Sequence, residues 1–282
     1  MNYNMFKGRR LIIATRHKKE QVIAPLFEKA FDVKCFTDQS FDTDSFGSFS
    51  GEIERTLGPV ETARQKCLAA MKKNDCDLGI ASEGSFGPHP SIFLINADDE
   101  FIIFIDKKNN IEVIARELSP STNFNGQVVQ SEKELMEFAD SIGFPEHGLI
   151  LRHSKEDTTE LHKGIVDEES LKNLFKSLKS KYGKAYVETD MRAMYNPTRM
   201  QVIQKAASKL VEQLKSKCPK CHMPGFTVAE VVSGLKCKLC GQPTRSTLSF
   251  VYLCKHCKCR EEELYPHQKT TEDPMYCDFC NP

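Results

Sequence analysis

The feature that most constrains the fold of this chain is a set of four Cys-x-x-Cys pairs near its C-terminus. Nine of its twelve cysteines lie between residues 218 and 280. A two-residue spacer lets a tight turn aim two thiolates at one metal ion, and a second pair completes a tetrahedral site. The pattern therefore predicts two structural zinc sites of four cysteines each. The pairs are Cys218/Cys221, Cys237/Cys240, Cys254/Cys257 and Cys277/Cys280.

The spacing of the pairs favours one way of combining them but leaves others open. Fifteen residues separate the first two pairs and nineteen the last two, so pairing in chain order is the simpler prediction. Pairing of the first pair with the third is an alternative, as is a slip of Cys254/Cys257 to Cys257/Cys259. His256 and His267 are spare candidate ligands. Four cysteines leave no open position on the ion, so catalysis by zinc is not expected.

The composition of the whole chain excludes several classes of protein. Its 282 residues are 40% hydrophobic and 28% charged, with 39 basic and 39 acidic side chains. Such a chain buries a sizeable core and has no net charge to attract nucleic acid or an anionic membrane. The apolar run at residues 11–14 is too short for a signal peptide, and no run approaches a membrane span. We expect a cytoplasmic protein without a membrane partner, whose crowded cysteines bind metal rather than form disulfides.

Strand and helix patterns alternate before the cysteines begin. Ser131 with Glu134 forms a capping-box pattern, and Asn196-Pro197 starts a long helix. The alternation predicts an α/β domain over residues 1–212, with a mixed sheet and helices on both faces, followed by a double zinc-ribbon domain over 213–282. Strands are predicted at 11–15, 78–82, 91–96, 101–105, 111–116, 148–151 and 185–188, and helices at 18–31, 59–73, 168–182 and from 197 onward.

Glu83 is the acid that stands out in the α/β domain. It follows the predicted strand at 78–82 and precedes a glycine-rich stretch, in the sequence DLGIASEGSFGP. Ligands of open α/β sheets bind at the carboxyl ends of strands, so a carboxylate at this position is a candidate metal ligand in an active site. An ordinary acid in a turn is the alternative.

Three stretches of the first hundred residues carry a family resemblance. They read IIATRHKKEQV, GPVETARQKCLAA and DCDLGIASEGSFGP. In this order they resemble the strand–loop–helix, the acidic helix and the strand–carboxylate–glycine segment of the inosine-triphosphatase (ITPase)-like nucleotide pyrophosphatases. The branch that acts on inosine and xanthosine triphosphates is the most similar. The resemblance implies an ITPase-like fold for the α/β domain.

The resemblance also assigns roles to residues of this chain. It implies that Thr15 and either Lys18 or Lys19 bind the triphosphate, and that Glu61 and Glu83 hold a catalytic metal. Mg²⁺ suits these residues, because it prefers one or two carboxylates with phosphate oxygens and water. The implied function is a magnesium-dependent hydrolase of a nucleoside triphosphate or a related phosphoanhydride. For Glu61 the alternative is an ordinary acid in the first turn of a helix.

A second function stays open beside the hydrolase. The chain has Arg16-His17 where the ITPase-like family has an asparagine. The alternative is a protein that binds a nucleotide without turnover and whose zinc ribbon docks a protein or a nucleic acid. A homo-oligomer is compatible with either function. Along its whole length the chain also resembles an uncharacterised bacterial family in which DMRAMYNPTRM, GLKCKLCGQPT and a final CNP recur, and which brings no activity.

The segment VETDMRAMYNPTR contains further candidate residues. In an extended segment Glu188, Asp190 and Arg192 share one side. Asp190 and Arg192 are therefore predicted to bind substrate, by reading a base or contacting a phosphate. A salt-bridged turn before the helix that Asn196 caps is the alternative.

Overall fold

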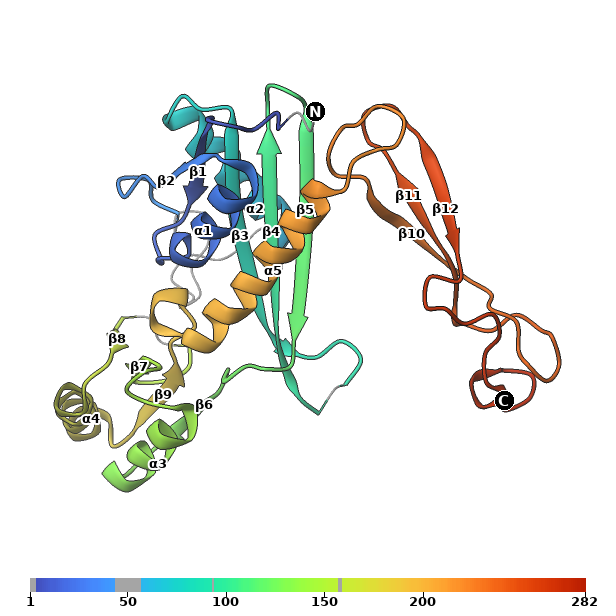
Figure 1. Cartoon of the computed structure of the whole chain (residues 1–282). Coiled ribbons are helices and arrows are strands. Elements are labelled where there is room, and N and C mark those ends of the chain that lie inside the picture. The colour runs from blue at the N-terminus through green and yellow to red at the C-terminus, as the bar shows by residue number, and fades with distance from the viewer. Residues whose placement is uncertain (1–3, 44–56, 93, 157–158) are drawn as a thin grey trace. The chain divides into compact units, whose positions relative to one another are not determined.

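The computed structural model describes residues 4–43, 57–92, 94–156 and 159–282 (Figure 1). The chain divides into two compact units. The first, the α/β unit, consists of Met1–Lys107 and Ile114–Val211, and the second, the cysteine-rich unit, consists of Lys108–Val113 and Glu212–Pro282. In the described part of the chain, no helix combines the length and the apolar character that crossing a membrane requires.

The larger sheet of the α/β unit has five strands in the order β2-β1-β3-β4-β5. β1 is parallel to β2 and β3, whereas β3 is antiparallel to β4, so the sheet is mixed, as predicted. Four of the five residues of β1 are buried and apolar, which suits a central parallel strand. The strands are β1 (Arg10–Ala14), β2 (Lys34–Phe36), β3 (Leu78–Pro88), β4 (Asn96–Asp106) and β5 (Ile111–Ser119).

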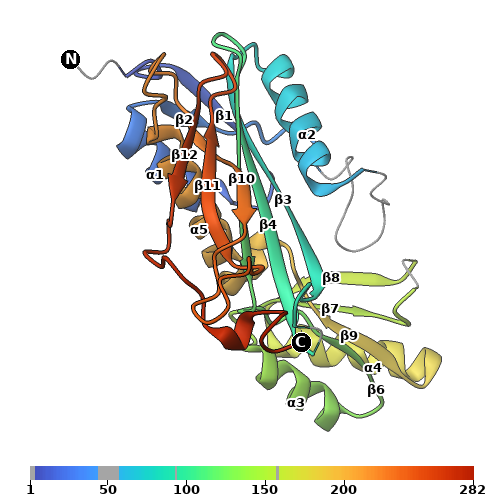
Figure 2. The same ribbon diagram turned by 90° about the vertical axis from the view of Figure 1, so that its right-hand side faces the viewer.

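Helices cover both faces of this sheet. α2 lies along β3 and packs Met71 against the face that carries Ile103 (Figure 2). On the opposite face Phe104 stacks on Phe27 of α1, with 6.2 Å between ring centroids. The helices of the chain are α1 (Glu20–Phe31), α2 (Pro59–Lys73), α3 (Glu132–Ile142), α4 (Glu168–Tyr182) and α5 (Pro197–Lys215), with 3₁₀ turns η2 (Ala193–Tyr195) and η3 (Pro274–Tyr276).

β3 runs farther than the sequence predicts. The predicted strand at 78–82 continues to Pro88, so Glu83 lies inside β3 and opposite Phe101 of β4 rather than in a loop. The predicted strand at 91–96 is wrong, because β4 begins only at Asn96. Gly84 suggested a loop but serves close packing instead: a Cβ there would meet Glu100 and Arg199.

A second, four-stranded sheet completes the α/β unit, where the sequence predicted a single sheet. Its order is β6-β9-β7-β8 and its strands pair antiparallel. α3 and α4 supply Leu135, Phe138 and Phe175 to the core on one face. The predicted cap of α3 is confirmed, since the Ser131 hydroxyl accepts a hydrogen bond from the Glu134 N–H at 3.2 Å. The strands are β6 (Gly126–Val129), β7 (Leu149–Arg152), β8 (Leu161–Ile165) and β9 (Ala185–Thr189).

The cysteine-rich unit is built on a three-stranded antiparallel meander. Its strands, in the order β10-β11-β12, are β10 (Thr227–Ser233), β11 (Thr247–Leu253) and β12 (Arg260–Leu264). Thr227 pairs with Leu253, and Leu253 pairs with Arg260, so these three residues mark one end of the sheet. The other end is marked by Ser233 with Thr247, and by Leu264. Each strand therefore carries the chain from one end of the sheet to the other.

Candidate functional site

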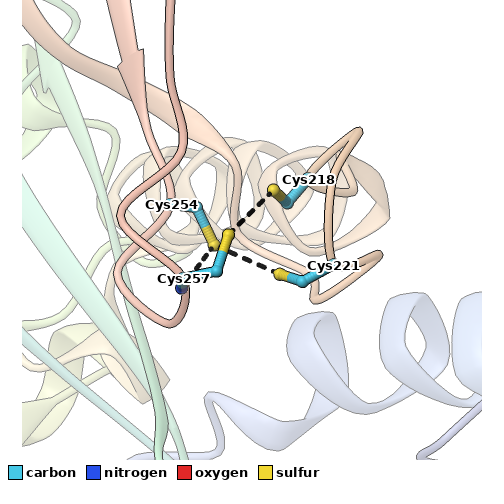
Figure 3. Close-up of side chains that lie close together, drawn as sticks. All are labelled: Cys218, Cys221, Cys254 and Cys257. Atoms are coloured by element: carbon cyan, nitrogen blue, oxygen red, sulfur yellow. Dashed lines mark hydrogen bonds between the residues drawn. The ribbon is translucent and has the colours of Figure 1, made fainter.

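The cysteines form two groups of four, one at each end of the meander. The first contains Cys218, Cys221, Cys254 and Cys257, whose side chains point toward one another (Figure 3). The second contains Cys237, Cys240, Cys277 and Cys280. In each group all four Sγ atoms lie within 4.8 Å of one another.

The spacing of the sulfur atoms matches a tetrahedral ion. Sγ–Sγ distances are 3.6 Å for Cys218–Cys257 and for Cys221–Cys254 in the first group. They are 3.9 Å and 3.6 Å for the corresponding contacts in the second group. Four sulfurs around one zinc at Zn–S of about 2.3 Å lie about 3.8 Å apart. Each group can therefore hold one zinc ion.

Pairing in chain order is wrong, and the alternative of the first pair with the third is confirmed. Because β10, β11 and β12 form a meander, successive Cys-x-x-Cys pairs are delivered to alternate ends of the sheet. The slip to Cys259 is not observed: Cys259 packs beside the first group without belonging to it. Neither His256 nor His267 belongs to a group, and the His267 ring instead packs edge-on against Phe250 at 5.4 Å.

All four Cys-x-x-Cys turns share one backbone hydrogen bond. In each, the residue four positions after the first cysteine donates its N–H to the carbonyl of that cysteine. The donors are His222, Gly241, Lys258 and Asn281, at 2.8 to 3.0 Å. Backbone N–H groups of Cys240 and Leu239 lower the pKa of the Cys237 thiol to about 7, against its burial. The turn at Cys237 thus favours the thiolate, the form of cysteine that can bind metal.

In the α/β unit, two of the predicted site residues come together at the end of β1. Lys19 is buried, and its Nζ donates to the Ser82 hydroxyl at 2.9 Å. Glu83, the next residue along β3, is also buried and forms an ion pair with Lys66 of α2. Desolvation, and then the charge of Arg199, lowers the pKa of Lys19 to about 8. Buried charges are costly and gather at functional sites, which makes this end of β1 a candidate site.

The other residues predicted for this site lie elsewhere or have other partners. Lys18 is exposed, with a left-handed φ of 59°. The Thr15 hydroxyl is buried and accepts a hydrogen bond from the His17 N–H at 3.1 Å. Glu61 forms an ion pair with Arg64 within α2, and 43% of its side-chain area is exposed. Lys19 and Glu83 are therefore both buried beside neighbouring positions of β3, Lys19 against Ser82 and Glu83 against Lys66.

Asp190 and Arg192 form the salt-bridged turn that was the alternative to substrate binding. Asp190 is fully buried, and its carboxylate accepts from the Arg192 Nη2 at 2.6 Å and from the Gly164 N–H at 3.0 Å. Its second oxygen accepts from the Arg192 backbone N–H at 3.0 Å. These bonds fix the chain between β9 and α5.

Three further charged residues, Glu100, Arg199 and Asp98, are buried near Lys19, and the sequence by itself pointed to neither Glu100 nor Asp98. Glu100 accepts from the Nε of Arg199 at 2.6 Å, and both side chains are at most 1% exposed. Asp98, two residues before Glu100 on β4, is 1% exposed. Burial, and then the charge of Glu100, raises the pKa of Asp98 to about 8. Alternate side chains of a strand project from the same face of the sheet. Asp98 and Glu100 therefore lie on the same buried face as Ile102 and Phe104, and this alternation in the sequence could have revealed them.

Comparison with known families gives one match. The model of a family described as a domain of unknown function, DUF6671, matches residues 66–282. The match begins at Lys66 and takes in all eight cysteines of the two groups together with Glu83, Asp98, Glu100 and Arg199. No curated protein matches the chain.

Proposed function

Because the chain belongs to the DUF6671 family, a domain of unknown function, we propose its function from the site itself. We propose that the α/β unit is a magnesium-dependent hydrolase of a nucleoside triphosphate or a related phosphoanhydride. The observation that supports this proposal is that two buried lysines from distant segments contact neighbouring residues of β3: Lys19 donates to Ser82, and Lys66 pairs with Glu83. We also propose that the unit has an ITPase-like fold, in keeping with the order of its first strands and helices.

The proposed roles follow from the chemistry of these side chains. Lys19 and Lys66 would bind phosphate oxygens as point charges. Phosphate would draw Lys66 away from Glu83 and leave that carboxylate to hold Mg²⁺. Glu61 would have to leave its partner Arg64 to join it. When bound, the metal would polarise the phosphorus and activate water as the nucleophile. Burial strengthens each of these interactions, because the effective dielectric constant is lower than in water.

A panel of nucleoside triphosphates and pyrophosphate, with Mg²⁺, tests this proposal by release of pyrophosphate and phosphate. We expect Glu83→Gln and Lys19→Met each to lower kcat by about 100-fold or more. Glu137→Gln is the matched control, because this glutamate is 65% exposed and pairs only loosely with Lys133 at 3.8 Å. Circular dichroism checks that each variant folds. A wild-type protein that releases nothing from the panel would refute the hydrolase.

One observation favours a second function, in which the cysteine-rich unit docks a protein. We propose that this unit is a double zinc ribbon with two structural zinc ions. Large apolar side chains around its second cysteine group are exposed: Leu239 by 75%, Met275 by 60%, Tyr276 by 59% and Phe279 by 67%. Apolar groups gathered at a rigid metal-bound tip are typical of protein contacts rather than of phosphate binding.

A further inference from the structure

Asp98 is a carboxylate that the fold buries without a hydrogen-bond donor. It is 1% exposed, and neither Oδ1 nor Oδ2 has a hydrogen-bond partner among the described residues. A buried polar group without a partner costs about 1–3 kcal/mol, and more when it is charged. Such groups are rare in native proteins and call for an explanation such as a bound ion.

A second carboxylate oxygen without a donor belongs to the same face of the same strand. Glu100 is two residues from Asp98 on β4, so both side chains project from one face. Arg199 occupies the Oε1 atom of Glu100, whereas Oε2 has no hydrogen-bond partner among the residues that the structure describes. Three buried carboxylate oxygens thus have no donor.

The neighbouring buried cations donate no hydrogen bond to these three oxygens, although the Nη2 atom of Arg199 is itself buried and has no hydrogen-bond partner among the described residues. The Nε of Arg199 is directed to Glu100, and its Nη1 donates to the carbonyl of Met191. Lys19 donates its Nζ to Ser82. These two positive charges act on Asp98 through space without donating a hydrogen bond to it.

We propose that Asp98 and Glu100 bind a divalent cation of the Mg²⁺, Mn²⁺ or Ca²⁺ class. These ions prefer anionic oxygen ligands, and Mg²⁺ is commonly held by only one or two carboxylates with water in the remaining positions. A metal ion is smaller than a water molecule and can be held between two buried carboxylates. The site contains no sulfur or imidazole ligand, so it does not suit zinc in the way the cysteine groups do.

This site is distinct from the metal ligands of the proposed hydrolase. Glu83 pairs with Phe101 and Gly84 with Glu100 in the β3–β4 register, so Glu83 projects from the α2 face and Glu100 from the opposite face. Bound metal would leave an excess of positive charge beside Lys19, where an anionic phosphate could bind. That coupling depends on the proposed function, whereas the cation site itself does not.

Titration of the zinc-loaded, full-length protein with Mn²⁺ in the absence of nucleotide tests the site. Electron paramagnetic resonance counts the bound Mn²⁺. We expect the wild type to bind one Mn²⁺ ion. Loss of a group that merely supports a metal ligand lowers affinity by roughly 10- to 100-fold, so Asp98→Asn should lower the affinity for Mn²⁺ by at least this much. Asn has nearly the shape of Asp, so Asp98→Asn should stay folded, and Mn²⁺ should raise the melting temperature of the wild type but not of this variant.

Two controls make the test specific. Asp99 is the neighbour of Asp98 on the opposite face and pairs with Arg116 at 2.7 Å, so Asp99→Asn should bind Mn²⁺ as the wild type does. Glu83→Gln should also bind Mn²⁺ normally, even if it abolishes hydrolysis. The proposal is overturned if the wild type binds no Mn²⁺, or if Asp98→Asn and Asp99→Asn bind it equally well. Hydrolysis lost in Glu83→Gln with Mn²⁺ binding intact would separate the two proposals.

Discussion

The two units of this protein are stabilised in opposite ways. After residue 217, seven apolar residues are buried, and four of them are the cysteines Cys218, Cys237, Cys254 and Cys277. The α/β unit instead buries aliphatic and aromatic side chains from helices on both faces of its larger sheet. The difference predicts that the cysteine-rich unit uses metal for what a hydrophobic core provides elsewhere.

Removal of metal should produce the largest effect and should affect one unit only. Binding of a structural zinc ion contributes about 10–16 kcal/mol in zinc-finger peptides, which is folding free energy when no site is preformed. We expect a strong chelator to unfold residues 217–282 and to leave the α/β unit intact. Hydrogen exchange of backbone amides checks this, and elemental analysis should find one zinc for each of the two cysteine groups. Protection retained in β11 after complete zinc removal would contradict the comparison.

Breaking the buried ion pair between Arg199 and Glu100 should give the next largest effect on stability. Arg199→Met leaves Glu100 buried without its partner, and we expect a loss of about 3–5 kcal/mol in the free energy of unfolding. The double variant with Glu100→Leu should regain much of this loss, because it removes the unpaired charge. Arg245→Met is the control, since its pair with Asp278 is exposed and contributes about 0–1 kcal/mol. Denaturant titration measures all three.

The pH dependence of stability should report on Lys19. Its pKa in the folded protein is about 8, below the ordinary value of 10.5, so between these pH values the unfolded chain binds more protons. The free energy of unfolding should therefore rise by about 3 kcal/mol from pH 8 to pH 10.5 on account of this residue, and stay level below pH 8. Lys19→Met should remove this rise. An identical pH profile in both proteins would show that Lys19 is not desolvated.

The smallest effect on stability is expected among the exposed apolar side chains around the second cysteine group. Phe279 is 67% exposed, so Phe279→Ser should change stability by less than about 0.5 kcal/mol. Phe226 is the matched control in the same unit: it is 7% exposed and packs against the first cysteine group. Replacement of Phe226 by Ser should cost about 3 kcal/mol or more. Equal losses of stability at the two positions would show that Phe279 is part of the core.

The sequence by itself determined which cysteines form the two groups that could hold metal, because a Cys-x-x-Cys turn is a local structure whose geometry depends on a few neighbouring residues. It also indicated the α/β alternation and the cap of α3, since these too depend on nearby positions. Glu83 was identified from its place at the end of an apolar run, whereas Lys19, with Lys18 as the alternative, was identified through the resemblance to the ITPase-like family. The strand that contains Glu83 was cut short in the prediction because its glycines resemble those of a loop.

Only the tertiary structure decided which residues from distant segments meet. The partner of each cysteine pair depends on the meander, which sends alternate pairs to opposite ends of the sheet. The buried charges come from α2, β3, β4, α5 and the residue before α1, and no local pattern links Lys66 or Arg199 to Asp98. Their proximity follows from the β3–β4 register and from helix packing, both of which are set by the burial of apolar surface along the whole chain.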